Sequence, residues 1–173
     1  QYRQCFARIS SIIRAEAPDM LIEWPPRRET EAHLRLESMY PGDEFVDIVG
    51  VLYYDWWPAA PTEADWNRTI VQRDRNGGPK GLATWLDFAQ QRGKPLSLPE
   101  WGIGKHREFD PFDNPLFIEK MYQFFSNNSR DIAYETYFNG TRHRIFSVTE
   151  GQRVVAPRSA ATYRRLYSTG ERR

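Results

Sequence analysis

Apolar side chains recur along the chain in two kinds of pattern, one with the period of a helix and one nearly continuous. Residues 2–16 place Phe6, Ile9 and Ile13 on one stripe at helical spacing, which predicts an amphipathic helix. The run FVDIVGVLYY at 45–54 is β-branched and almost wholly apolar, which is typical of a parallel strand covered on both faces. Shorter apolar runs predict strands at 20–24, 94–99 and 132–138.

Helical patterns lie between and after these strands. Residues 81–92 carry one apolar side and end at Gly93, a residue that commonly terminates helices. Residues 115–126 begin with a proline, which is well tolerated in a first helical turn, and residues 160–167 predict a last short helix. The polar segment 27–38 is a weaker helix candidate, and YPGD at 40–43 predicts a turn.

The alternation of strands and helices predicts an α/β fold with parallel pairing through right-handed crossovers. Four such units fit half of a (β/α)8 TIM barrel, which needs about 250 residues in full. We therefore expect residues 1–173 to form a single domain that supplies about half of a barrel. A small doubly wound sheet is the alternative, and the lack of a glycine-rich phosphate loop after any strand weakens it.

Composition narrows the function. The 6 Trp, 9 Tyr and 10 Phe residues are many for 173 residues, and flat rings serve both cores and ligand clefts. The 24 basic and 23 acidic residues leave a net charge of +1, which gives no support for a nucleic-acid partner. A single cysteine, Cys5, and three scattered histidines predict no metal site, and we expect no cofactor. No apolar run approaches the roughly 20 residues of a membrane span, and no signal peptide is visible.

Functional residues of a barrel lie where its strands end. The predicted strand ends carry, in chain order, Trp24, then Tyr54 with Trp56 and Trp57, then Glu100 with Trp101, then Tyr137, Phe138 and Asn139. Three ends are aromatic, and the remaining one is a carboxylate followed by an aromatic ring. Rings that stack on sugars around an acid are what glycoside hydrolysis requires. The pattern therefore indicates a sugar cleft around Glu100.

Other acids and histidines have weaker claims. Glu135 lies within a predicted strand and is the runner-up acid, facing either the barrel interior or its outside. Glu23 alternates with Trp24, so we expect it to point toward the helix layer. His106 could reach the cleft from the loop after Glu100, while the other histidines are expected at the surface. For Trp56 and Trp57, packing against the barrel rim competes with a sugar platform.

Several stretches resemble glycoside hydrolase family 26, the β-mannanase family. YPGDEFVDIVGVLYYDWW looks like the segment that runs into its sixth strand, and KPLSLPEWGIG looks like its seventh. YRQCFARISSIIRAEAPDMLIEWPP resembles the helix after strand four together with a Trp-bearing strand five. YFNGTRHRIFSVTEGQRVVAPRSAATYRRLY resembles strand eight and the closing helix. The resemblance covers essentially the whole chain, and it implies a retaining glycosidase.

The resemblance also implies residue roles. Glu100 would be the nucleophile, and Tyr54 would donate its hydroxyl to that carboxylate and help keep it ionised. Trp24 would form part of the sugar-binding floor, with substrate contacts from Trp56, Trp57, Trp101, Tyr137 and Asn139. Leu52 departs from the acidic residue that the family often has there, which leaves fine specificity open.

A retaining glycosidase needs a second carboxylate, the acid/base, about 5–5.5 Å from the nucleophile. In the family this residue ends strand four, which by the resemblance falls before Gln1. We therefore expect an N-terminal half-barrel as partner, on the same protein or on a separate chain. The expected substrate is a β-linked glycan, with β-mannan first and mixed-linkage glucan or xylan behind. The resemblance implies a secreted or periplasmic location. The alternatives are a non-catalytic glycan-binding module and a bacterial exopolysaccharide-processing protein.

Overall fold

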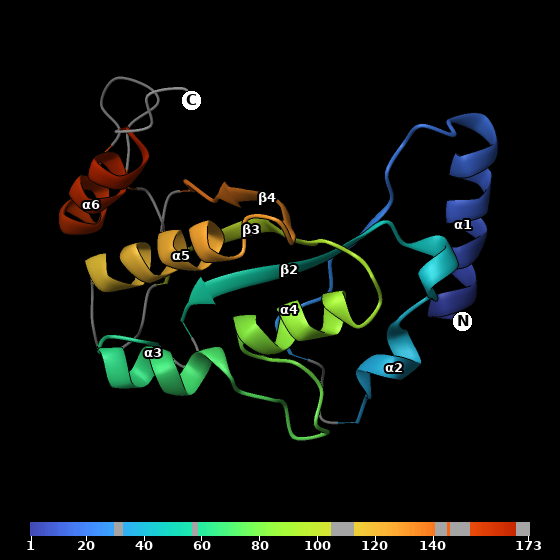
Figure 1. The fold of residues 1–173 in the computed structure, drawn as a ribbon, viewed down its shortest axis with the longest axis horizontal. Coiled ribbons are helices and arrows are strands. Elements are labelled where there is room, and N and C mark those ends of the chain that lie inside the picture. The colour runs from blue at the N-terminus through green and yellow to red at the C-terminus, as the bar shows by residue number, and fades with distance from the viewer. Residues whose placement is uncertain (30–32, 57–58, 105–112, 141–144, 146–152, 169–173) are drawn as a thin grey trace. The chain divides into compact units, whose positions relative to one another are not determined.

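The computed structural model describes residues 1–29, 33–56, 59–104, 113–140, 145 and 153–168. Its helices are α1 (Tyr2–Glu16), α2 (Leu36–Met39), α3 (Glu63–Ile70), α4 (Leu82–Gln90), α5 (Pro115–Asn127) and α6 (Pro157–Tyr167), with a short 3-10 helix η1 (Asp43–Phe45). The strands of the described part are β1 (Glu23–Trp24), β2 (Ile48–Asp55), β3 (Leu96–Ile103) and β4 (Ile132–Tyr137). They form one sheet in the order β1-β2-β3-β4 (Figure 1).

The sheet and its helices confirm the predicted α/β fold. Strands β1 and β2 pair in parallel, with Trp24 opposite Val49. Helix α1 precedes the first strand, and the other helices fall between and after the strands, as the apolar pattern predicts. Strand order that follows chain order, with a helical segment in each connection, is the arrangement of a (β/α)8 barrel and differs from a doubly wound sheet.

Some element bounds differ from the prediction. The strand β3 runs on to Ile103, so Glu100 lies inside the strand and not after its end. A proline at 99 removes one backbone donor but keeps an extended conformation, so it does not stop the strand. Helix α2 covers only Leu36–Met39 of the polar segment, and α3 was not predicted because its apolar stripe is short.

The chain forms two compact units. The first consists of Gln1–Leu52, Ile70–Pro99 and Arg130–Glu135, and the second consists of Tyr53–Thr69, Glu100–Ser129 and Thr136–Arg173. The strands β2, β3 and β4 each begin in the first unit and end in the second. The single catalytic domain expected for residues 1–173 stays a prediction.

The core of the first unit is aromatic. The Trp24 indole is fully buried, with ring centroids 5.0 Å from Tyr40 and 6.2 Å from Phe88. Phe88 belongs to α4, so this cluster joins the strand β1 to the helix layer. The Arg92 guanidinium lies 3.5 Å from the centroid of the Phe88 ring and closes the cluster by a cation–π contact.

The core of the second unit is built around Trp101, which is fully buried. Its ring centroid lies 4.9 Å from that of Tyr137 on β4 and 5.5 Å from that of Phe125 on α5. Helix α5 packs beside α6, gold and red in Figure 1. The Asp113 carboxylate accepts hydrogen bonds from the backbone N–H groups of Arg158 and Ser159, at 2.8 and 2.7 Å. These bonds satisfy donors that the first turn of α6 leaves unpaired.

Candidate active site

Tyr54 of β2 and Glu100 of β3 meet within the second unit. The Tyr54 hydroxyl donates a hydrogen bond to Oε1 of Glu100, and both side chains are half-buried. Among the residues that the structure describes, none donates a hydrogen bond to the other carboxylate oxygen, Oε2. The pair therefore holds one oxygen of the carboxylate in place and leaves the other open.

Ring packing holds Tyr54 in position. Its ring centroid lies 6.3 Å from that of Trp56, and the same distance separates it from Phe138 in an edge-to-face contact at 87°. Gly102 lies beneath the ring: a Cβ there would come within 3.3 Å of Tyr54 Cε1. The first glycine after Glu100 thus gives the Tyr54 ring the space it occupies.

The Tyr54 hydroxyl remains a donor across the neutral range. Burial raises the pKa of Tyr54 above its ordinary value of 10.0, and the hydrogen bond to Glu100 and the charge of that carboxylate raise it further. A phenol with a raised pKa keeps its proton, so it offers Glu100 a hydrogen bond and adds no negative charge beside it.

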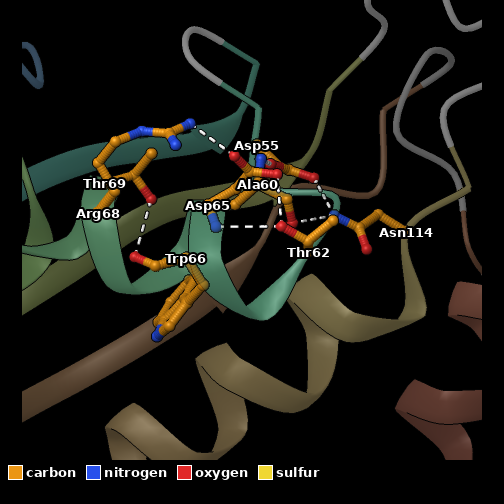
Figure 2. Close-up of polar contacts among 8 residues, drawn as sticks. All are labelled: Asp55, Ala60, Thr62, Asp65, Trp66, Arg68, Thr69 and Asn114. Carbon is orange, nitrogen blue, oxygen red and sulfur yellow. Dashed lines mark hydrogen bonds and ion pairs between the residues drawn. The ribbon is translucent and has the colours of Figure 1, made fainter.

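Directly after Tyr54, the chain turns around a buried carboxylate (Figure 2). Asp55 is 2% exposed, and its Oδ1 accepts a 2.7 Å hydrogen bond from the backbone N–H of Ala60. Its Oδ2 accepts a 2.6 Å hydrogen bond from the side-chain amide of Asn114. The end of β2 is therefore linked to Ala60 and to the start of α5.

The chain is similar to proteins of known sequence and of known structure. A search of family models finds no match. A mannan endo-1,4-β-mannosidase of Bifidobacterium adolescentis is 31% identical over 96 residues, which cover 56% of this chain and 8% of that protein. The solved structure of GH26C from Muricauda sp. matches 98% of this chain and 42% of its own, with a TM-score of 0.63 and 21% identity. A family 26 β-mannanase from Bacteroides ovatus matches 97% of this chain and 43% of its own, with a TM-score of 0.58 and 15% identity.

The chain has the fold of glycoside hydrolase family 26. The predicted resemblance to that family is thereby confirmed, and so is the predicted fold class, part of a (β/α)8 barrel. The chain spans less than half the length of these solved barrels and a small fraction of the curated mannosidase.

The predicted aromatic residues of the family 26 site occupy different environments. Trp56 is 49% exposed and flanks Tyr54, so its indole has a free surface. Trp101 is fully buried and Tyr137 is 8% exposed, so both pack beneath the site. Burial raises the pKa of the Tyr137 hydroxyl above its ordinary value, and that hydroxyl stays protonated. Trp57 lies outside the described residues.

Asn139 has a local contact. Its Oδ1 accepts a 2.9 Å hydrogen bond from the backbone N–H of Ile145, which joins two points of the segment after β4. The side chain is half-buried, so its predicted substrate contact stays a prediction.

The first unit corrects one expectation about side-chain direction. Trp24 packs in the helix layer, whereas Glu23 lies on the other face of the sheet, where it accepts hydrogen bonds from Ser97 and Tyr134. The prediction that Glu23 points toward the helices was therefore wrong. The large indole gains more from burial among rings, while the carboxylate needs hydroxyl donors. As placed, Trp24 has no exposed surface, and its role as a sugar floor stays a prediction.

The remaining candidates are an acid of β4 and the three histidines. Glu135 follows Tyr134 on β4, so it faces the opposite side of the strand from the residue that contacts Glu23. His33 is exposed, as expected, while His106 and His143 lie outside the described residues. Within the described ranges, no cluster of three or more His, Cys, Asp or Glu side chains could hold a metal ion. No helix in the same ranges is long and apolar enough to cross a membrane.

Sequence reasoning missed the residues that support the pair. Asp55 stood in the string YYDWW as an acid between aromatic rings, and its burial was not foreseen. Asn114 precedes Pro115, and this Asn-Pro pair is a helix-start signal that could have placed its side chain at the beginning of α5.

Proposed function

We propose that this chain supplies the nucleophile-bearing half of a retaining glycoside hydrolase that cleaves β-1,4-linked glycans, with β-mannan as its substrate. One observation carries the proposal: Glu100 has one oxygen held by the Tyr54 hydroxyl and one that no described residue occupies. The mannanase names of the matched proteins support the substrate class. Ring-bearing strand ends around the carboxylate fit a sugar cleft.

In this mechanism, the open oxygen of Glu100 attacks the anomeric carbon and forms a covalent glycosyl–enzyme ester. The bond from the anomeric carbon to the leaving sugar breaks, and the leaving oxygen takes a proton from the acid/base. Water, deprotonated by the same acid/base, then cleaves the ester and releases Glu100. Tyr54 keeps the carboxylate oriented through both steps by donating to Oε1.

The acid/base is proposed to come from an N-terminal half-barrel, on the same protein or on a separate chain. The matched family 26 barrels are more than twice as long as the aligned chain, which leaves room for that half. The two carboxyl groups would lie about 5–5.5 Å apart, as retention requires. Polymeric mannan is too large to enter a cell intact, so the proposal includes an extracellular or periplasmic location.

Substrate contacts follow from exposure. Trp56 offers a free ring face beside Tyr54 and is the proposed stacking platform. Trp57 and Asn139 remain candidate substrate-binding residues, whereas the burial of Trp24 in the helix layer argues against a sugar contact for that indole. Trp101 and Tyr137 act beneath the site, because their rings pack against each other.

The test replaces Glu100 with Ala in a preparation that contains the acid/base-bearing half. Turnover of β-mannan is expected to be lost, and azide is expected to restore cleavage of an activated β-mannoside with an α-mannosyl azide as product. The matched control is Glu135→Gln, which removes another carboxylate of the chain and is expected to leave turnover intact. The same preparation is assayed on mixed-linkage glucan and on xylan, and the glycan with the highest kcat/KM is assigned as the substrate.

A non-catalytic glycan-binding module makes the opposite prediction. If the protein is such a module, the parent protein with its N-terminal half binds mannan without cleaving it. Glu100→Ala then changes neither the affinity for mannan nor the absence of cleavage. Undiminished cleavage by the Ala variant would refute Glu100 as the nucleophile.

A further inference from the structure

The turn after β2 is closed by hydrogen bonds on both of its ends (Figure 2). The Ala60 N–H donates to Asp55 Oδ1, and the Ala60 carbonyl accepts a 2.9 Å hydrogen bond from Asn114 Nδ2. The same Nδ2 donates to Asp55 Oδ2. The two hydrogens of the Asn114 amide thus both donate, one to the Asp55 carboxylate and one to the Ala60 carbonyl, on either side of Trp56 in sequence.

Asn114 is also fixed at its other end. Its Oδ1 accepts a 3.2 Å hydrogen bond from the backbone N–H of Phe117 and caps α5. The Phe117 ring stacks on Tyr53 at 6.4 Å and 6°, and it meets Trp66 of α3 edge-on. Asn114 is 6% exposed. Its side chain therefore connects a rigid helix start to the end of β2.

The end of β3 presses on the same turn. A Cβ at Gly104 would lie 2.5 Å from the Asp55 carbonyl oxygen and 2.7 Å from Trp56 Cβ, so only glycine allows this approach. The backbone of Asp55 thus lies close to Gly104, and its carboxylate accepts hydrogen bonds from Ala60 and Asn114. Its chain neighbour Tyr54 begins the turn, because the Trp56 N–H donates to the Tyr54 carbonyl at 2.9 Å.

We propose that Asp55 and Asn114 are positioning residues that hold the Tyr54 hydroxyl on Glu100 by fixing the turn that follows Tyr54. The pair touches neither substrate nor reacting atoms. It acts through the backbone: a shift of the turn moves Tyr54 relative to a carboxylate on a different strand. The consequence for turnover rests on the proposed function, whereas the consequence for the Tyr54–Glu100 contact does not.

The test variant is Asn114→Ser, which keeps an oxygen able to cap α5 but removes the amide that reaches Asp55 and Ala60. The matched control is Met121→Ala, which opens a cavity in the fully buried face of α5 without touching a polar contact. If Asn114→Ser does not fold, the exchanged pair Asp55→Asn with Asn114→Asp is compared with Asn114→Asp alone. Asn114→Asp alone puts a second carboxylate beside that of Asp55. The double variant, Asp55→Asn with Asn114→Asp, again has one amide facing one carboxylate, with the two groups exchanged.

The first readout needs no substrate. Tyrosines labelled with fluorine are followed by NMR on the full chain; Tyr54→Phe identifies the Tyr54 signal, and Glu100→Ala marks its position without the hydrogen bond. Asn114→Ser is expected to move the signal toward the Glu100→Ala position, and Met121→Ala is expected to leave it in place. The proposal is overturned if the Tyr54 signal does not move in Asn114→Ser. It is also overturned if the exchanged pair places that signal no nearer to its original position than Asn114→Asp does.

The second readout is turnover with the acid/base half present. Misplacement of Tyr54 is expected to lower kcat by about 10- to 100-fold with little change in KM. A loss no greater than that of Met121→Ala, at equal folded fraction, contradicts a positioning role. If Glu100→Ala retains turnover, the proposed function fails while the NMR result still decides the positioning of Tyr54.

Discussion

Two glutamates of the sheet accept a hydrogen bond from a tyrosine hydroxyl on another strand, and they differ in what remains free. Glu23 in the first unit accepts from Ser97 at Oε1 and from Tyr134 at Oε2, so both of its oxygens are occupied. Glu100 in the second unit accepts from Tyr54 at Oε1 alone among the described residues. Both oxygens of the first carboxylate therefore have a donor, whereas only one oxygen of the second has a donor among the described residues.

The difference lies in how many donors the fold supplies to each carboxylate, and it bears on the role proposed for Glu100. A carboxylate oxygen has two lone pairs, so one hydrogen bond at each oxygen of Glu23 does not by itself exclude attack on a substrate. Glu100, the proposed nucleophile, differs in that the described residues supply a donor to only one of its oxygens. Proximity to a tyrosine therefore does not identify a nucleophile, and the number of donors is one observation that supports the proposal for Glu100.

The largest expected effect separates these two glutamates. Glu100→Gln is expected to lower kcat/KM on β-mannan by at least about 1,000-fold, because an amide cannot attack the anomeric carbon. Glu23→Gln is expected to keep kcat and to lower the free energy of unfolding by about 1–3 kcal/mol, since charge-assisted hydrogen bonds are lost. Steady-state kinetics with the acid/base half present and urea unfolding provide the measurements. Loss of turnover in Glu23→Gln and not in Glu100→Gln would contradict the roles assigned to the two glutamates.

The second prediction contrasts two tryptophans of the second unit. Trp101→Ala is expected to cost about 3–5 kcal/mol of unfolding free energy, because the indole is fully buried among rings. Trp56→Ala is expected to cost well under that and to raise KM, because half of its surface is exposed. Urea unfolding and mannan kinetics separate the two. Equal destabilisation by both variants would contradict the assignment of Trp56 as a platform.

The third prediction contrasts the two glycines of PEWGIG. Gly104→Ala would place a methyl group 2.5 Å from a backbone oxygen, so the strand ends must separate, and we expect a loss of about 1–3 kcal/mol. Gly102→Ala meets the Tyr54 ring at 3.3 Å, a side chain that can shift, so a smaller loss of stability is expected. Thermal unfolding of the two variants is the measurement. A larger loss at Gly102 would show that the ring is held more rigidly than the backbone.

The smallest effect is a pH dependence that the two tyrosines share. Burial, followed by the hydrogen bond to a glutamate, raises the pKa of Tyr54 and of Tyr134 above 10.0. Each hydroxyl binds its proton more tightly in the folded chain, so its stabilising effect is complete below pH 10.0 and is lost as pH rises through the folded pKa. Urea unfolding from about pH 9 to pH 12 should show a decline in stability above pH 10.0, where the unfolded tyrosine loses its proton and the folded one keeps it. Tyr54→Phe and Tyr134→Phe should each flatten it, and an unchanged slope in both would refute the cause.

The sequence alone was sufficient for several particular features. Continuous apolar runs predicted β2 and the existence of β1, β3 and β4, because buried parallel strands need such residues on both faces. Gly93 and Pro115 marked the end of one helix and the start of another. Tyr54 and Glu100 were predicted as partners through a family resemblance, and the structure brings them together.

Other features could not be foreseen, since they depend on contacts between distant segments. The side-chain directions of Glu23 and Trp24 were assigned the wrong way round, because alternation along a strand says which residues oppose each other and not which face is covered. Pro99 suggested the end of a strand that continues to Ile103. The partners of Asp55 lie 5 and 59 positions away in sequence, beyond any local pattern.

Strand and helix periodicity and turn residues predicted most of the elements and placed an acid, Glu100, at the end of an apolar run, because these follow from local burial and backbone preferences. Only the tertiary structure decided that Glu100 lies inside β3, that the Tyr54 hydroxyl donates to its Oε1, and that the Asn114 amide donates to Asp55 next to Tyr54. Hydrogen-bond saturation depends on which donors the fold brings within about 3 Å, and that is set by packing between segments distant in sequence.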